Sequence, residues 1–283
     1  MFQTTYIPVT TPSDSLTTHD GARLALHRWP GDGRRGTVLL VHGLGEHGGR
    51  YAHVAAWFAE RAFRCIGYDH RGHGRSDGAR GVLPSATTLR DDLGVVIEQV
   101  RPRDEPFVLL GHSMGGAVVA DFVARRIRSA DLVILSSPAL KPRLSPFQRL
   151  QLAIGLRFLP DTALANGLDA NAIAHDAATV RAYLDDPLVH DRVSARLAQA
   201  IIDAGETARA AAPKWDTATL LVYAGADRLV DPAGSDTFAA SAPGGVVEAQ
   251  RFDALYHEIL NEGALAAPVF ARIERWLDAR WPG

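Results

Sequence analysis

Short apolar runs separated by polar turns dominate the chain from residue 37 onward. Each run is apolar almost throughout, which is typical of strands in a parallel sheet covered on both faces, because a strand with one wet face would alternate. Before these runs, two short alternating segments flank Asp20-Gly21, a dipeptide suited to a tight turn, and predict a hairpin at a sheet edge. The apolar runs themselves predict six central strands, at residues 37–42, 63–69, 106–112, 131–137, 219–225 and 246–252.

Apolar residues at helical spacing lie between several of these runs. Stripes that begin at Tyr51, Leu89 and Leu265 recur at intervals of three and four residues, so each predicts a helix with one face against the sheet. Alternation of strand and helix implies right-handed crossovers and an open α/β architecture. In such folds the ligand site is expected at the carboxyl ends of the strands.

Residues 138–213 interrupt this alternation. They contain no strand-like run and predict several short helices, which we interpret as an inserted helical cap on a core formed by residues 1–137 and 214–283. Within the cap, residues 146–160 are apolar on most sides. This segment could pack on the core, line an acyl pocket or contact a lipid surface. The cap side chains that we expect to contact substrate are Phe147, Ile154 and Phe158.

Composition and charge exclude several classes of protein. With 47% hydrophobic and 22% charged residues the chain matches a globular protein and not a disordered one. The net charge is −2 without a run of like charges, so we expect no nucleic-acid partner. The start of the chain lacks a basic region followed by an apolar stretch, and no apolar run is long enough to span a bilayer. We therefore expect a cytoplasmic protein, whose oligomeric state stays open.

The strongest chemical signal is the sequence GHSMGG at residues 111–116, between an apolar strand and a helical stretch. A serine on such a sharp turn needs glycines beside it, since larger side chains would clash with the strand and the helix. The turn then presents the hydroxyl of Ser113 above the sheet. A free serine hydroxyl is a poor nucleophile and needs a histidine base, which in turn needs an orienting carboxylate.

Chain order in this architecture is nucleophile, acid, histidine, with the last two after later strands. His257 is the only histidine beyond Asp227 and follows the last predicted strand. Asp227 lies closest to the carboxyl end of its strand, ahead of the competing Asp231, Asp236 and Asp253. We expect Ser113, Asp227 and His257 to form a catalytic triad.

An acyl-transfer site also needs two donors for the developing oxyanion. One should be the backbone N–H of Met114, because it follows the nucleophile at a helix N-terminus. The other should come from the loop after the first central strand, and Leu44 is the best-placed residue there. Backbone donors place no demand on side-chain identity, so these two residues are chosen by position.

A rival signal lies in that same loop. Gly43, Gly45 and Gly48 spell G-x-G-x-x-G between a strand and a helix, and Asp69 ends the next strand, which satisfies the fingerprint of a dinucleotide-binding oxidoreductase. The glycines are equally required to shape an oxyanion loop, and the fingerprint leaves the order of serine, aspartate and histidine unexplained. The NAD-binding interpretation is therefore disfavoured.

A histidine-rich stretch around Asp69 could be read as a set of metal ligands. The residues concerned are His42, His47, Asp69, His70 and His73. Their glycine-rich setting and the lack of a helical i, i+4 pair favour a hydrogen-bonded turn network. We expect no metal and no cofactor.

Six segments together resemble the monoacylglycerol lipase group of the α/β-hydrolases: HGLGEHGGRY, YDHRGHGRSDG, GHSMGG, DDPLVH, GADRLVD and YHEILNE. The likeness runs from about residue 15 to 281, in the family's order and with its cap gap. It implies an α/β-hydrolase fold, with a mostly parallel sheet, helices on both faces and an inserted cap. It implies the same triad and the same oxyanion donors, Leu44 and Met114, and it suggests that Glu46 and Arg50 lie near the alcohol end of the substrate.

The activity that the resemblance implies is that of a serine ester hydrolase, a monoacylglycerol lipase that releases a fatty acid and glycerol through an acyl-enzyme. A lysophospholipase or a general carboxylesterase remains open, as do a peptidase, a carbon–carbon hydrolase and an acyltransferase, because these activities can use the same residues. We expect a small lipid ester as substrate and transient contact of the cap with lipid surfaces, which would make the protein peripheral at membranes.

Overall fold

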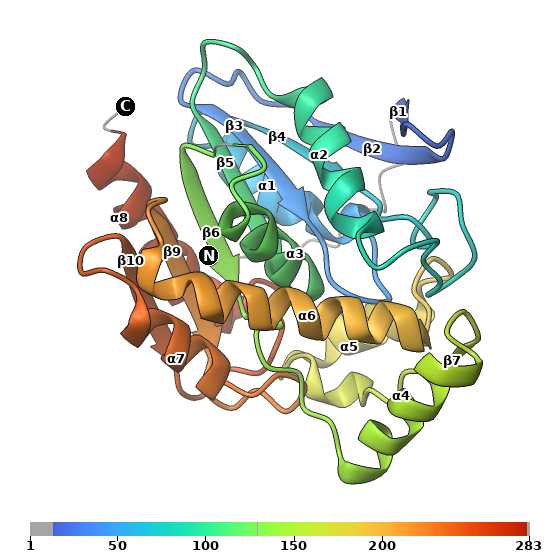
Figure 1. The fold of residues 1–283 in the computed structure, drawn as a ribbon. Coiled ribbons are helices and arrows are strands. Elements are labelled where there is room, and N and C mark those ends of the chain that lie inside the picture. The colour runs from blue at the N-terminus through green and yellow to red at the C-terminus, as the bar shows by residue number, and fades with distance from the viewer. Residues whose placement is uncertain (1–13, 129, 282–283) are drawn as a thin grey trace.

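The computed structural model describes residues 14–128 and 130–281. Within them, one eight-stranded sheet runs through the molecule in the order β1-β2-β4-β3-β5-β6-β9-β10 (Figure 1). Within this sheet, only the pairings of β1 with β2 and of β2 with β4 are antiparallel. The strands are β1 Asp14–Thr17, β2 Arg23–Trp29, β3 Gly36–Val41, β4 Phe63–Tyr68, β5 Phe107–His112, β6 Leu132–Ser136, β9 Thr219–Ala224 and β10 Val247–Phe252.

The strand predictions are confirmed. All six central strands lie within one residue of their expected bounds, and the hairpin of β1 and β2 forms one edge of the sheet. β10 forms the other edge, and several of its side chains are exposed. Residues 1–13, which we assigned to the core, lie outside the described residues.

Helices cover both faces of the sheet. Alternate residues of the buried strands enter different apolar cores: Leu39 joins the core beneath α2, α3, α6 and α7, whereas Leu40 joins the core beneath α1 and α8. This is the two-sided burial that continuous apolar runs predict. The helices are α1 Ala52–Ala59, α2 Thr88–Val100, α3 Ser113–Ala124, α6 Ala195–Ala211, α7 Ala233–Ser241 and α8 Ala267–Arg280, with 3₁₀ turns η1 Gly48–Tyr51, η3 Ala212–Lys214 and η4 Gly263–Ala266.

The segment between β6 and β9 contains α4 Pro146–Phe158, η2 Ala170–Ala172, α5 Ala177–Asp185 and α6. The expectation that it lacks strands is wrong, because β7 Ala163–Ala165 pairs antiparallel with β8 Arg192–Ser194. Strands of three residues leave no apolar run in the sequence, so the pattern could not reveal them. We keep the name cap for residues 138–213.

Two helices of the cap differ in what they cover. α6 packs along α3 and shares its core, so it belongs to the helical layer over the sheet (Figure 1). α4 projects away from the sheet and buries none of its residues. It begins with a capping box, in which Ser145 and Gln148 satisfy each other's backbone N–H groups, so its N-terminus is well formed. Only the side of α4 that faces α6 is half-buried. The boundary of the cap as a separate unit remains a proposal.

The turn from β5 into α3 is unusually tight. Ser113 has a φ of 53°, in the left-handed region that non-glycine residues seldom adopt. A Cβ on Gly111 would lie 2.6 Å from the carbonyl oxygen of Gly115, and a Cβ on Gly115 would overlap the carbonyl oxygens of Val41 and His42. The glycines of GHSMGG are therefore required because α3 begins in direct contact with β5 and with the end of β3.

Replacing Gly115 by alanine should destabilise the fold by about 3 kcal/mol or more, since the new methyl group meets backbone atoms that cannot move aside. Gly94 is the matched control. It lies inside α2, where a Cβ would meet only Phe122, at an ordinary 3.6 Å, so Gly94→Ala should stabilise by up to about 1 kcal/mol through helix propensity. Urea unfolding of both variants measures the difference, and equal midpoints would contradict the packing argument.

Candidate active site

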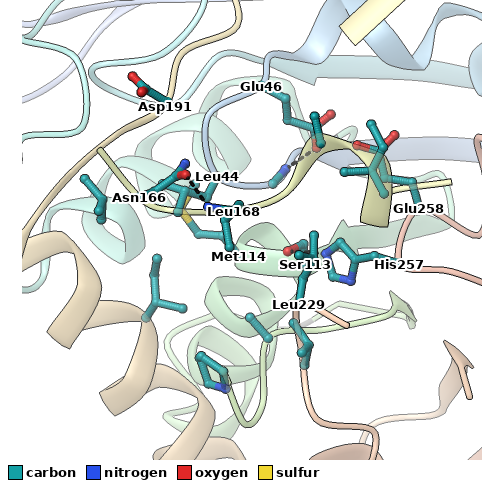
Figure 2. A pocket seen from close by; sticks show the side chains of 18 of the residues that line it. Leu44, Glu46, Ser113, Met114, Asn166, Leu168, Asp191, Leu229, His257 and Glu258 are labelled. Atoms are coloured by element: carbon teal, nitrogen blue, oxygen red, sulfur yellow. Dashed lines mark hydrogen bonds between the residues drawn. The ribbon is translucent and has the colours of Figure 1, made fainter. Parts of the chain in front are cut away.

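Three side chains from distant parts of the chain meet at the carboxyl ends of the strands. Figure 2 shows two of them, Ser113 and His257. Ser113 follows β5, Asp227 follows β9 and His257 follows β10. The Oγ of Ser113 lies 2.8 Å from Nε2 of His257, and Nδ1 of His257 lies 2.6 Å from Oδ2 of Asp227. The structure thus joins the three residues in the order that nucleophilic catalysis by serine requires.

Asp227 and His257 are buried, and their charges depend on each other. Burial raises the pKa of Asp227, but His257 and the backbone N–H groups of Val230 and Leu229 lower it by more, so the pKa lies below its usual value. Burial lowers the pKa of His257, yet the charge and hydrogen bond of Asp227, together with the charges of Glu258 and Glu46, more than offset this and the pKa is raised overall. With Nδ1–H donated to the carboxylate, Nε2 is left to accept the proton of Ser113.

The two expected oxyanion donors flank Ser113. Met114 lies in the first turn of α3, where backbone N–H groups have no partner within the helix. Leu44 follows β3, and this loop passes so close to the serine that a Cβ on Gly43 would come within 3.1 Å of the Ser113 Cβ. Leu44, Ser113 and Met114 line one cavity.

That cavity has a volume of about 330 Å³ and is mostly apolar. Core and cap both contribute to its walls: Leu229 and Val230 come from the core, whereas the cap supplies Leu144, Ile173, Leu184, Val189, Val193, Ile201 and Ile202. These cap residues were not singled out in the sequence, because they lie on several elements and no local pattern connects them. Together they form an enclosure suited to an acyl chain.

Polar side chains also line the cavity: Glu46, His112 and Glu258 belong to the core, whereas the cap supplies Arg143, Gln148, Asn166, Tyr183, Asp186, His190 and Asp191. Glu46 and Glu258 lie together beside His257 in Figure 2, on the side away from Leu168. Arg50 binds both carboxylates: it donates two hydrogen bonds to Glu258, of 2.9 and 2.8 Å, and one to Glu46. Among the described residues that line the cavity, Glu46 and Glu258 are present and Arg50 is not. The expected position of Arg50 near the alcohol end of a substrate remains a prediction.

The two carboxylates differ electrostatically. Burial raises the pKa of Glu46 more than the charge of Arg50 lowers it, and the neighbouring charge of Glu258 adds to the rise, so the pKa lies above its usual value. Burial by itself would also raise the pKa of Glu258, but the guanidinium of Arg50 lowers this pKa to about 2. Glu258 was missed in the sequence, where the only available signal was its position directly after His257.

Three expected substrate contacts need correction. Phe147, Ile154 and Phe158 are 68%, 51% and 70% exposed, and none of them lines the cavity. The reason is the position of α4, which projects into solvent and contributes only Gln148 to the lining. An acyl chain in the cavity would meet other cap residues.

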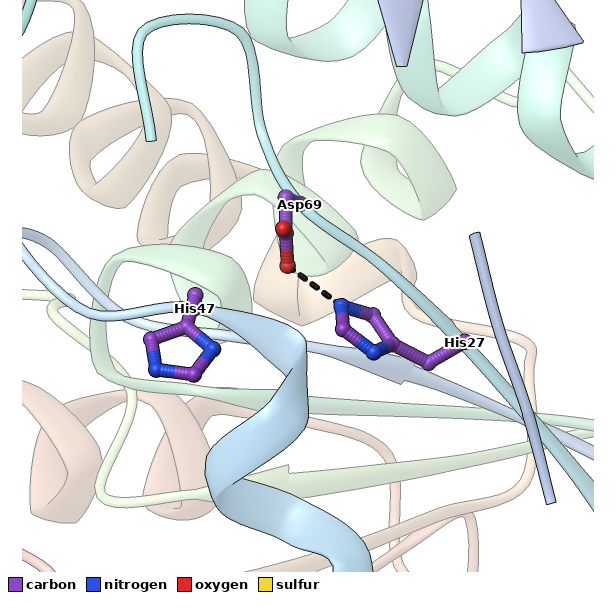
Figure 3. Close-up of side chains that lie close together, drawn as sticks. All are labelled: His27, His47 and Asp69. Atoms are coloured by element: carbon purple, nitrogen blue, oxygen red, sulfur yellow. Dashed lines mark hydrogen bonds and ion pairs between the residues drawn. The ribbon is translucent and has the colours of Figure 1, made fainter. Parts of the chain in front are cut away.

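His27, His47 and Asp69 lie together behind the loop after β3, with one ligand atom of each within 4.8 Å of the others (Figure 3). Most of their polar side-chain atoms already have partners, and Nδ1 of His27 is the exception among the described residues. The carboxylate of Asp69 accepts hydrogen bonds from His27 and from the N–H groups of Gly48 and Arg75. His47 accepts one from the backbone and binds Asp186. The donor set therefore fits a hydrogen-bonded support for the loop better than a metal site.

The same bonds bear on the dinucleotide interpretation. The N–H groups of Gly43 and Gly48, which a pyrophosphate would need, are bonded to the side chains of Glu46 and Asp69. Asp69 is fully buried and is not free to bind a ribose. The glycine spacing in this loop therefore reflects its folding and gives no support to a nucleotide site.

Comparison with known proteins agrees with this geometry. A family model described as serine aminopeptidase, S33 matches residues 32–264. The chain belongs to this family of α/β-hydrolases. A monoacylglycerol lipase of Mycolicibacterium smegmatis is 34% identical over 249 residues, which cover 86% of this chain and 88% of that protein.

A monoacylglycerol lipase of Paleococcus ferrophilus, known from its crystal structure, is 32% identical and superposes with a TM-score of 0.82 over 90% of this chain and 98% of that one. An uncharacterized abhydrolase domain-containing protein of Dictyostelium discoideum is 32% identical over 96% of this chain, which spans only 29% of that protein's length. Fold and family therefore agree with the expectations from the sequence. Across residues 14–128 and 130–281, none of the helices has the length and hydropathy of a membrane span.

Proposed function

We propose that this serine hydrolase is a monoacylglycerol lipase, which releases a fatty acid and glycerol. One observation carries the proposal: the hydrogen-bonded series from Ser113 through His257 to Asp227 opens into a largely apolar cavity with two carboxylates at one side. The similarity to monoacylglycerol lipases of two other organisms supports it.

The proposed reaction proceeds through an acyl-enzyme. His257 takes the proton of Ser113 through Nε2 while the serine oxygen bonds to the ester carbonyl carbon, and the N–H groups of Leu44 and Met114 bind the oxyanion. The bond to the alcohol then breaks, and glycerol leaves with the proton from His257. Water attacks the acyl-enzyme in the same way, releases the fatty acid and returns the proton to Ser113.

The charge at the alcohol side favours a neutral substrate. Glu46 and Glu258 both line the cavity, and Arg50 is the cation that both of them bind. Hydroxyl groups of glycerol can donate to carboxylate oxygens, whereas the phosphate of a lysophospholipid would be repelled by them. This argues for a monoacylglycerol over a lysophospholipid within the α/β-hydrolase class.

Ser113→Ala should lower kcat for a monoacylglycerol by a factor on the order of 10⁶, as in other triads, because no nucleophile remains. A panel of monoacylglycerols, lysophosphatidic acids of the same chain lengths and short nitrophenyl esters measures the preference of the wild type, with the variant as control. We expect the neutral glycerol esters to have the highest kcat/KM. Near wild-type rates for Ser113→Ala would contradict the mechanism, and faster turnover of the anionic lipids would contradict the substrate.

The pH dependence follows from the state of His257. Only the neutral imidazole can accept the serine proton, so kcat/KM should fall as pH is lowered through a pKa above the ordinary 6.5. Removing the charge of Asp227 should move this pKa downward. In Asp227→Asn, the fall of kcat/KM at acidic pH is therefore expected at lower pH than in the wild type. The kcat of this variant should be lower by a factor of roughly 10⁴. An unchanged limb in this variant would show that another group controls the profile.

We also propose that α4 contacts the surface of lipid assemblies. Phe147, Leu150, Ile154 and Phe158 are exposed on this helix, although apolar side chains of this size are normally buried. Contact with acyl chains would cover them and bring the cavity close to its substrate. The cytoplasmic location expected from the sequence remains a proposal.

Substitution of Phe147 or Phe158 by aspartate should weaken co-sedimentation with neutral phospholipid vesicles at least tenfold, since burial of a phenylalanine contributes about 1.5 to 3 kcal/mol. Ile127→Asp is the control, because Ile127 is also exposed, at 44%, but lies outside the cap. Hydrolysis of a short soluble ester should not change in any of the three. Equal binding by all variants would contradict the role of α4.

A further inference from the structure

We propose that Asp186, in the cap, is a positioning residue for the oxyanion donor of Leu44 and acts on it through His47. The inference rests on the proposed function, because it concerns the same reaction. It adds a task for the cap beyond enclosing the acyl chain. Hydrogen bonds from both core and cap hold residues 43–49, which we call the oxyanion loop.

The core holds the oxyanion loop at its two ends. At the first end, the Gly43 N–H donates to Glu46 at 2.6 Å, and the Gly43 carbonyl lies 2.7 Å from Nδ1 of His42. That carbonyl shares a peptide unit with the N–H of Leu44, so its bond fixes the direction in which the N–H points. At the far end, the Gly48 N–H donates to Asp69 at 2.8 Å.

The middle of the loop is held from the cap. The backbone N–H of His190 donates to the carbonyl of Gly45 at 2.8 Å. Gly45 has a φ of 78°, and a Cβ there would overlap the carbonyl oxygen of His190, so the two backbones are in direct contact. Leu44 therefore lies between one peptide fixed by the core and one fixed by the cap.

The side chains of His47 and Asp186 form a second hydrogen bond between the oxyanion loop and the cap. Nδ1 of His47 accepts the Gly49 N–H at 3.2 Å, which leaves Nε2–H to donate to Oδ2 of Asp186 at 2.9 Å. The other oxygen of Asp186 accepts the N–H of Leu188 at 2.8 Å. One carboxylate thus binds the oxyanion loop and shapes the turn that leads to His190.

This pair is well shielded, with the side chains of His47 and Asp186 only 0% and 8% exposed. Burial alone would raise the pKa of Asp186, but the bonds from His47 and Leu188 lower it below its usual value, which keeps the acceptor ionised. Loss of the carboxylate would release both the imidazole and the turn. The N–H of Leu44 could then leave the direction it needs to bind the oxyanion, and an error of about 1 Å in such a site can cost roughly a hundredfold in rate.

The test compares Asp186→Ala, Asp186→Asn and the control Asp185→Ala, which removes the exposed neighbouring carboxylate. With a short soluble ester, Asp186→Ala should lower kcat by about 10- to 100-fold and change KM less than about twofold, because an oxyanion contact stabilises the transition state and not the bound substrate. Asp186→Asn should recover most of the rate, since its carbonyl oxygen can accept the same bond. Asp185→Ala should match the wild type.

A second measurement separates positioning from loss of structure. Affinity for a trifluoromethyl ketone, whose adduct with Ser113 carries the oxyanion, should fall in Asp186→Ala by about the same factor as kcat/KM, while a non-hydrolysable ether analogue should bind as before. If Asp186→Ala does not fold, His47→Phe offers the same comparison, because the ring volume is kept while the donor to Asp186 and the acceptor of the Gly49 N–H are both removed.

Two outcomes would overturn the inference. In the first, Asp186→Ala has a lower Tm but a normal kcat. In the second, both ligands lose affinity equally. Ser113→Ala, assayed in parallel, distinguishes failure of this inference from failure of the proposed function. An active Ser113→Ala would reject the proposed function. An inactive Ser113→Ala together with a fully active Asp186→Ala would reject only the role of Asp186.

Discussion

The close contact between the start of α3 and the end of β3 is the constraint on which the site depends. Gly115 lies directly against the carbonyl oxygens of Val41 and His42, at a distance that no side chain permits. This contact forces the left-handed backbone at Ser113 and brings the oxyanion loop beside the serine. Sheet, helix and loop together hold one residue in an unfavourable conformation, which is how strain at a reactive group is usually maintained.

The wall of the cavity near Ser113 has an apolar part and a charged part. Aliphatic side chains from core and cap line most of the wall, whereas Glu46 and Glu258 meet at one side and bind Arg50 between them. Burying two carboxylates with one guanidinium costs free energy unless each oxygen finds a donor. Gly43, Tyr51 and Asn261 supply those further donors. An ester with an apolar chain and a small hydroxylated alcohol fits both environments at once.

Much of the fold and of the triad could be predicted from the sequence, because both leave local signals. The buried strands appear as continuous apolar runs, and Ser113 is marked by the glycines that its turn requires. His257 was identified from chain order alone. The lining of the cavity could not be predicted in this way, since Ile173, Val193 and Ile201 lie on separate elements and meet only in three dimensions.

The error over α4 has a related origin. A segment that is apolar on most sides is usually buried, and nothing in its own sequence tells a helix covered by protein from one exposed to solvent. Likewise β7 and β8 are too short to produce a pattern, although they pair two segments of the cap that lie far apart in the sequence. The role of Glu258 depends on Arg50, which lies 208 positions away in the chain, so no local pattern could have revealed it.

The exposed edge of the sheet at β10 has a consequence for the protein in concentrated solution. An open strand edge is a template on which another molecule can add a strand, and this is a common route to aggregation. Glu248 on β10 binds Arg272 and Arg280 of α8, and Arg251 on the same strand binds Asp253. A second sheet that joined this edge would have to place a strand beside these charged side chains, which is one way in which natural sheet edges resist such pairing. The ion pairs therefore act as a barrier to fibre-like assembly and help the molecule to remain dispersed.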